Sequence, residues 1–68
     1  MVSKHEKEVW NILDYQKIKS TNEILGELMK RTNKTINWFL VYKILKNLEE
    51  SSKVERLISK GGLFWRKK

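Results

Sequence analysis

The sequence contains no cysteine and only one histidine, His5. Disulfide bonds and cysteine-ligated zinc are therefore excluded, and no nucleophile or acid is placed to form a catalytic set with His5. A glycine-rich phosphate loop is missing too, because no helix-forming segment follows Gly61 and Gly62. A chain of 68 residues also has little volume for a substrate pocket. We therefore expect no enzymatic activity, no cofactor and no small-molecule ligand.

Long apolar segments are also missing. The longest apolar run extends only from Trp38 to Tyr42, far short of the ~20 residues that a membrane-spanning helix needs. Charged residues throughout positions 1–15 leave no apolar core for a signal peptide. The sequence therefore predicts a single cytoplasmic domain over residues 1–68, without membrane association.

Negative charge is scarce relative to positive charge. Fifteen Lys and Arg residues against eight Asp and Glu residues give a net charge of +7. Such a surplus on a small surface favours polyanionic partners, of which nucleic acid is the commonest. Small lysine-rich domains that bind no polyanion carry the same surplus, so charge alone does not decide between the two. Apolar residues make up 40% of the chain, which is too many for a disordered tail.

Two capping boxes, Ser3 to Glu6 and Ser20 to Glu23, mark the starts of helices. The apolar residues that follow recur at helical spacing and extend these helices over about residues 4–14 and 21–31. A third apolar stripe predicts a helix that begins at residue 35 or 37 and ends near residue 50. The sequence therefore predicts three helices in the first three quarters of the chain.

Composition typical of β-strands takes over after residue 53. Residues 54–58 and 63–65 are predicted strands, and the turn at 59–62 contains two glycines that supply the positive φ of tight hairpins. Residues 66–68 are predicted to form a basic tail. Ile18, alone between lysines, indicates a short edge strand. The predicted fold class is α+β: three helices, a short edge strand and a C-terminal hairpin.

Three expectations concern single positions inside these elements. Trp10 and Trp65 are expected in the core, since large aromatic residues dominate the energetics of small domains. Gly26 destabilises its helix by about 1 kcal/mol relative to alanine. A close approach of another helix would explain why a glycine stands there, and so would chance. Asn37 is expected to face inward from the third helix and to serve as its N-cap.

Residues 41–56, with the sequence VYKILKNLEESSKVER, resemble the segment between recognition helix and wing in winged helix-turn-helix transcription regulators, including the MarR-like and penicillinase-repressor-like groups. Residues 20–28 look like the second helix of these families, and the resemblance covers about residues 6–66. Those families usually have glycine where Ser51 or Ser52 stands. The resemblance implies a sequence-specific regulator that binds double-stranded DNA as a homodimer, with half-sites ~10 bp apart.

In such a fold the third helix enters the major groove, and the wing lies on the backbone or in the minor groove. Lys43 would reach guanine or phosphate, Phe39 a thymine methyl group, and Lys60 a phosphate or the minor groove. The start of the second helix would offer hydroxyl and N–H groups to a phosphate. The residues implied in DNA binding are Ser20, Thr21, Lys34, Thr35, Asn37, Trp38, Phe39, Tyr42, Lys43, Lys46, Lys60 and Arg66.

Two other functions fit the same pattern. Phe39 and Tyr42 lie one helical turn apart, where polar base-reading side chains are expected, and can instead form a protein-binding patch. An architectural protein that binds DNA or RNA would use the same basic surface without reading bases. The short, cysteine-free chain, rich in lysine and isoleucine, is also compatible with a regulator encoded by a virus or plasmid.

Overall fold

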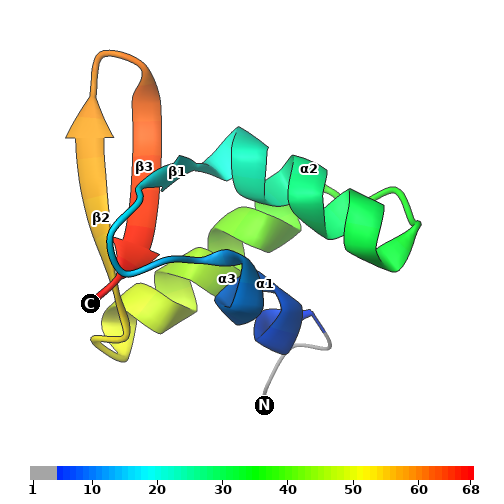
Figure 1. Cartoon of the computed structure of the whole chain (residues 1–68), viewed down its shortest axis with the longest axis horizontal. Helices are drawn as coiled ribbons and strands as arrows, with labels where there is room; N and C mark the ends of the chain where they lie inside the picture. Colours follow the sequence, from blue (N-terminus) through cyan, green and yellow to red (C-terminus); the bar gives the residue numbers. More distant parts are fainter. Residues whose placement is uncertain (1–4) are drawn as a thin grey trace.

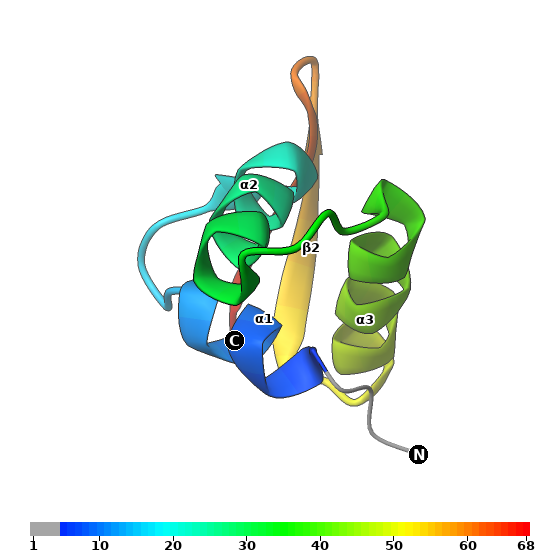
Figure 2. The ribbon, with the colours of Figure 1, turned by 90° about the vertical axis from the view of Figure 1, so that its right-hand side faces the viewer.

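The computed structural model describes residues 5–68 and contains the three predicted helices (Figure 1). They are α1 (Glu6–Ile12), α2 (Thr21–Thr32) and α3 (Trp38–Glu50). The predicted capping box at the start of α1 begins at Ser3, which lies outside the described residues. α1 and α2 pack against each other, and α3 packs against both of them and against the first long strand of the hairpin (Figure 2).

The first helix ends two residues earlier than predicted, at Ile12. Leu13 has an extended backbone and is nevertheless buried. The carboxylate of Asp14 accepts a hydrogen bond of 2.8 Å from the N–H of Gln16. Such a local bond offers the backbone an alternative to helix, which explains the early end.

The strands form one antiparallel sheet in the order β1-β3-β2. β2 (Val54–Ser59) and β3 (Gly62–Lys67) are the predicted hairpin, and β1 (Lys19–Ser20) follows the expected position of the edge strand by one residue. The prediction of a basic tail at residues 66–68 was wrong for Arg66 and Lys67, which pair with β2. The fold class is therefore α+β as predicted, with a topology consistent with a winged helix.

The hairpin turn differs in detail from the predicted one. Ser59 pairs with Gly62, so only Lys60 and Gly61 lie between the strands. Of the two glycines only Gly62 has a positive φ, +119°. The residue that requires a positive φ is therefore the first residue of β3, and neither residue inside the turn requires one.

The core draws side chains from every helix and from both long strands. Trp65 of the central strand β3 is completely buried, and its indole Nε1 donates a hydrogen bond of 2.8 Å to the hydroxyl of Thr21. Trp10 is only partly buried and packs against the core from one side. The core consists of Val9, Ile12, Leu13, Ile24, Leu28, Ile36, Val41, Ile44, Leu45, Leu48, Val54 and Trp65. In residues 5–68 no buried polar side-chain atom lacks a hydrogen-bond partner.

At the start of α3 one prediction for Asn37 is confirmed and another is corrected, and the end of the helix has a left-handed cap. Asn37 is the N-cap, and its side-chain oxygen accepts from the N–H of Phe39 at 2.7 Å. Asn37 is exposed, however, and does not face inward. An N-cap residue does not have helical backbone angles, so the helical spacing that places the apolar side chains of α3 inward does not apply to it. At the other end Ser52 adopts φ +61° and Lys53 N–H donates to Leu48 O at 2.9 Å, as in a Schellman motif.

Gly26 does not mark a close approach between helices. A Cβ atom built at this position meets no atom within 4 Å, and Gly26 has no positive φ. Of the two explanations offered for this glycine, the packing requirement is therefore excluded.

Candidate nucleic-acid interface

Three features that the resemblance assigns to DNA binding lie toward one edge of the molecule. Figure 2 shows the hairpin tip, the first turn of α2 and the first turn of α3 all directed toward its upper side. The hairpin projects beyond the helices because its last strand pairs extend past the core. We call this edge the upper face.

Three rings at the start of α3 form an aromatic cluster, which we define as Trp38, Phe39 and Tyr42. The rings of Trp38 and Tyr42 stack with centroids 5.3 Å apart and planes 8° apart, as residues one helical turn apart can. Phe39 tilts against Tyr42 at 6.4 Å. Tyr42 in turn meets buried Trp65 edge-on at 6.3 Å, so the cluster is anchored to the core. Trp38 is 41% exposed and Phe39 57%.

The lysines of α3 differ in how far their charges are compensated. Lys43 is exposed and makes no ion pair with the described residues, and its ammonium lies 5.7 Å from the centre of the Phe39 ring. Lys46 lies 3.8 Å from the carboxylate of Glu49, which also pairs with Arg56 at 3.3 Å. The positive charge available on the outward side of α3 is therefore that of Lys43.

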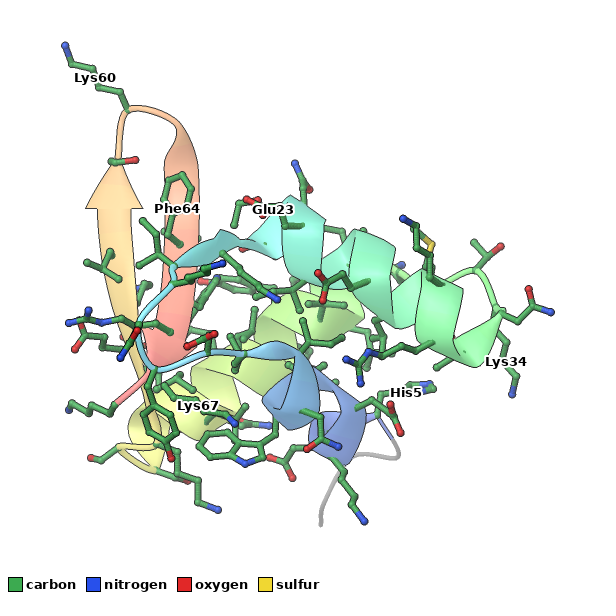
Figure 3. The ribbon with its side chains drawn as sticks, in the orientation of Figure 1. His5, Glu23, Lys34, Lys60, Phe64 and Lys67 are labelled. Atoms are coloured by element: carbon green, nitrogen blue, oxygen red, sulfur yellow. The ribbon has the colours of Figure 1, made fainter. Side chains whose placement is uncertain are left out.

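Of the two hairpin cations implied in DNA binding, one is uncompensated and one is paired. Lys60 lies at the hairpin tip and points away from the body of the protein (Figure 3). It forms no ion pair in the described part of the chain. Arg66 binds Oε1 of Glu55 through both Nε and Nη2 at 3.0 Å, so its charge is largely neutralised. Ile58, near the tip, is 74% exposed.

The start of α2 offers less to a phosphate than the sequence implied. The Ser20 hydroxyl accepts from Glu23 N–H at 3.1 Å, and the Glu23 carboxylate accepts from Ser20 N–H at 3.4 Å, which confirms the predicted capping box. Thr21 is buried, with its hydroxyl bound to Trp65. Because both hydroxyls are engaged and a carboxylate lies beside them, we leave Ser20 and Thr21 out of the interface.

Lys34 and Thr35 are exposed in the connection between α2 and α3. Figure 3 places Lys34 at the opposite end of the molecule from Lys60, and the two side chains point in opposite directions. Thr35 precedes the N-cap of α3 and so lies outside the helix. Apart from Ser20 and Thr21, the residues named from the sequence therefore divide into an upper-face group on α3 and at the hairpin tip, a separate pair in this connection, and Arg66 near the base of the hairpin.

A lysine held between two rings was not foreseen from the sequence. The ammonium of Lys67 lies 4.5 Å from the centre of the Trp10 ring and 5.3 Å from that of Tyr15. Its backbone N–H donates to the carbonyl of Asp14 at 2.8 Å. Trp10 also lines an open hollow of about 360 Å³ beside Leu48 and Lys53. Side chains alternate between the two faces of a strand, so Lys67 lies on the same face of β3 as Trp65, toward the helices. This alternation is the only sequence signal that could have predicted the position of Lys67.

Within residues 5–68 no group of three or more His, Cys, Asp or Glu side chains is arranged to hold a metal ion. No helix in this part of the chain is long and apolar enough to cross a membrane. Comparison with protein-family models, with curated proteins and with solved structures gives no match. The structural basis for a function is thus the architecture itself, three helices followed by a hairpin with an edge strand, together with the side chains of the upper face.

Proposed function

We propose that the protein is a sequence-specific regulator that binds double-stranded DNA, with the first two turns of α3 in the major groove and the hairpin tip on the adjacent backbone or in the minor groove. The observation that carries the proposal is the placement of Lys43 and Lys60. Both are exposed, neither has a carboxylate partner in residues 5–68, and they stand on the outward side of α3 and at the tip of the wing.

The chemistry of these groups suits two different parts of a DNA duplex. Lys60 on a projecting hairpin reaches phosphate, which fixes position and carries no sequence information. Lys43 on the groove-facing helix can donate to guanine O6 or N7, and Phe39 can contact a thymine methyl group. The net charge of +7 adds a long-range attraction that speeds association.

Selection of bound duplexes from a random pool at physiological salt tests the proposal. The expected result is an enriched motif, and two half-sites ~10 bp apart would add support for a homodimer. Lys60→Ala should weaken binding to all sequences alike and lower the salt slope by about one, whereas Lys43→Ala should change the enriched motif.

Lys53→Ala is the matched control for both variants. It removes the same charge from an exposed side chain in the turn after α3, at the end of that helix far from the upper face. The proposal fails if no motif is enriched, or if the variants at Lys43 and Lys60 bind as the control does.

One observation favours a second function, docking of a protein on the upper face. Phe39 is 57% exposed and Ile58 74%, and apolar surface of this kind is common where proteins associate. In that case DNA binding is weak and Lys43→Ala leaves it unchanged. The same selection experiment therefore separates the two functions.

A further inference from the structure

We propose that the upper face binds duplex DNA more tightly when the duplex contains an unpaired base, and that this base stacks on the indole of Trp38. The inference rests on the proposed DNA binding and specifies the form of DNA that the face prefers. Trp65, Tyr42 and Trp38 follow one another from the core to the surface, and Trp38 is the outermost of the three.

The indole of Trp38 is oriented before any ligand arrives. Tyr42 covers one side of it in a nearly parallel stack, and Tyr42 is itself held edge-on against the fully buried Trp65. No other ring in residues 5–68 packs on Trp38, and 41% of the residue is exposed. A further flat ring can therefore continue the stack, and little side-chain freedom remains to be lost when it does.

A fully paired duplex does not offer such a ring. Its base faces are covered by their neighbours, and the major groove exposes only base edges, which are read by hydrogen-bonding side chains. Trp38 has one polar hydrogen, on Nε1, and cannot act as a bidentate reader. Aromatic side chains instead bind bases that have left the stack, as in proteins that hold single strands or flipped nucleotides. The chemistry of the cluster thus fits an unpaired base.

The charges around Trp38 agree with a nucleotide as the ligand. The first turn of α3 contains no acidic residue, and Lys43, one helical turn after Phe39, has no carboxylate partner among residues 5–68. Its ammonium lies over the Phe39 ring, near enough to the cluster to meet a phosphate that flanks the stacked base.

Three duplexes of one sequence test the inference. The first is fully paired, the second has one bulged base, and the third has an abasic nucleotide in the bulge. The two bulged duplexes share the same distorted backbone and differ only in the base that can stack. The wild-type protein should bind the base bulge about 5- to 150-fold more tightly than the abasic bulge, the range of stacking on one aromatic side chain.

Variants and a spectroscopic signal make the outcome specific to Trp38. Trp38→Ala should bring the base-to-abasic ratio close to one, Trp38→Phe should retain part of it, and Lys53→Ala should keep it. In the Trp10→Phe protein, tryptophan emission should be quenched by the base bulge and not by the abasic one, because Trp65 is buried. Thermal unfolding of each variant confirms that the fold is retained.

The possible failures are distinguishable. Equal affinity for all three duplexes overturns the stacking inference and leaves duplex binding intact. A base preference that survives in Trp38→Ala also overturns it. If none of the duplexes binds and the random pool also yields no enriched motif, the proposed function fails together with the inference.

Discussion

Thr21 joins the first turn of α2 to the central strand through a single buried hydrogen bond. Its hydroxyl accepts from Trp65 Nε1 at 2.8 Å. Thr21→Val keeps the shape of the side chain and leaves this buried donor unpaired, which costs about 1–3 kcal/mol. We expect urea unfolding to show a loss of this size. Thr21→Ser, which keeps the hydroxyl, should lose less, and equal losses in the two variants would contradict the assignment.

Gly26 and Gly62 are predicted to respond oppositely to the same substitution. Gly26→Ala removes an unfavourable residue from a helix interior with free space around it, so it should stabilise the protein by about 1 kcal/mol. For a domain of this size that raises Tm by roughly 4–8 °C. Gly62→Ala places a side chain at φ +119° and should lower Tm. Calorimetry of both proteins checks the pair, and a lower Tm for Gly26→Ala would contradict the absence of a packing partner.

Roles of single residues that depend on close neighbours in the sequence could be predicted, whereas a role that depends on a distant residue could not. The capping roles of Ser20 and Asn37 could be predicted because a cap depends on residues two or three positions away. The burial of Thr21 could not, since its partner Trp65 is distant in the sequence and only the sheet brings them together. A hydroxyl at a helix start has the same local pattern whether it faces solvent or the core.

The end of α3 contains a serine in a conformation that favours glycine. Ser52 has φ +61°. Two hydrogen bonds cap the helix at this point, one donated by Ser52 N–H to Glu49 O and one donated by Lys53 N–H to Leu48 O. A left-handed non-glycine residue costs roughly 1–2 kcal/mol, so Ser52→Gly should stabilise the protein by up to about that amount. Denaturant unfolding measures it. Asn33→Gly, at φ +54°, is the control and should gain less, because asparagine tolerates this region better.

The connection between α1 and β1 is predicted to weaken in acid. The hydrogen bond from Gln16 N–H to the Asp14 carboxylate lowers the pKa of Asp14 below its ordinary value of 3.8. Because the pKa is lower in the folded protein, the carboxylate contributes stability above pH 3.8, and this is lost as the pH falls through the folded value. An NMR titration should show the low pKa, and Asp14→Asn should remove this part of the pH dependence of unfolding.

The existence and order of the elements were predictable, whereas their exact ends and the charge pairing between elements were not. The helices and the hairpin follow from apolar spacing and turn residues, which are local signals. The pair of Arg66 with Glu55 depends on the register of two strands, whereas Lys46 and Glu49 lie three residues apart on one helix, so helical spacing alone could have predicted that pair. Both cations were assigned to DNA from the sequence, although each has an acidic neighbour in the fold.

The charge of the protein should make salt act in opposite directions on folding and on DNA binding. Its five ion pairs among the described residues are at least partly exposed, and such pairs contribute little. Repulsion within a net charge of +7 remains, and salt screens it. Raising salt from roughly 50 to 200 mM should therefore increase Tm slightly and weaken DNA binding. Thermal scans and binding titrations in the same buffers measure both, and a parallel decrease would contradict the expectation.

The sheet order places the strand that comes last in the sequence at the centre, between β1 and β2. That strand also carries Trp65, the largest fully buried side chain. During synthesis on the ribosome, the helices and β2 emerge before their common packing partner exists. We therefore expect the core to be completed only after β3 has emerged, and until then the apolar helix side chains that pack against Trp65 lack this partner.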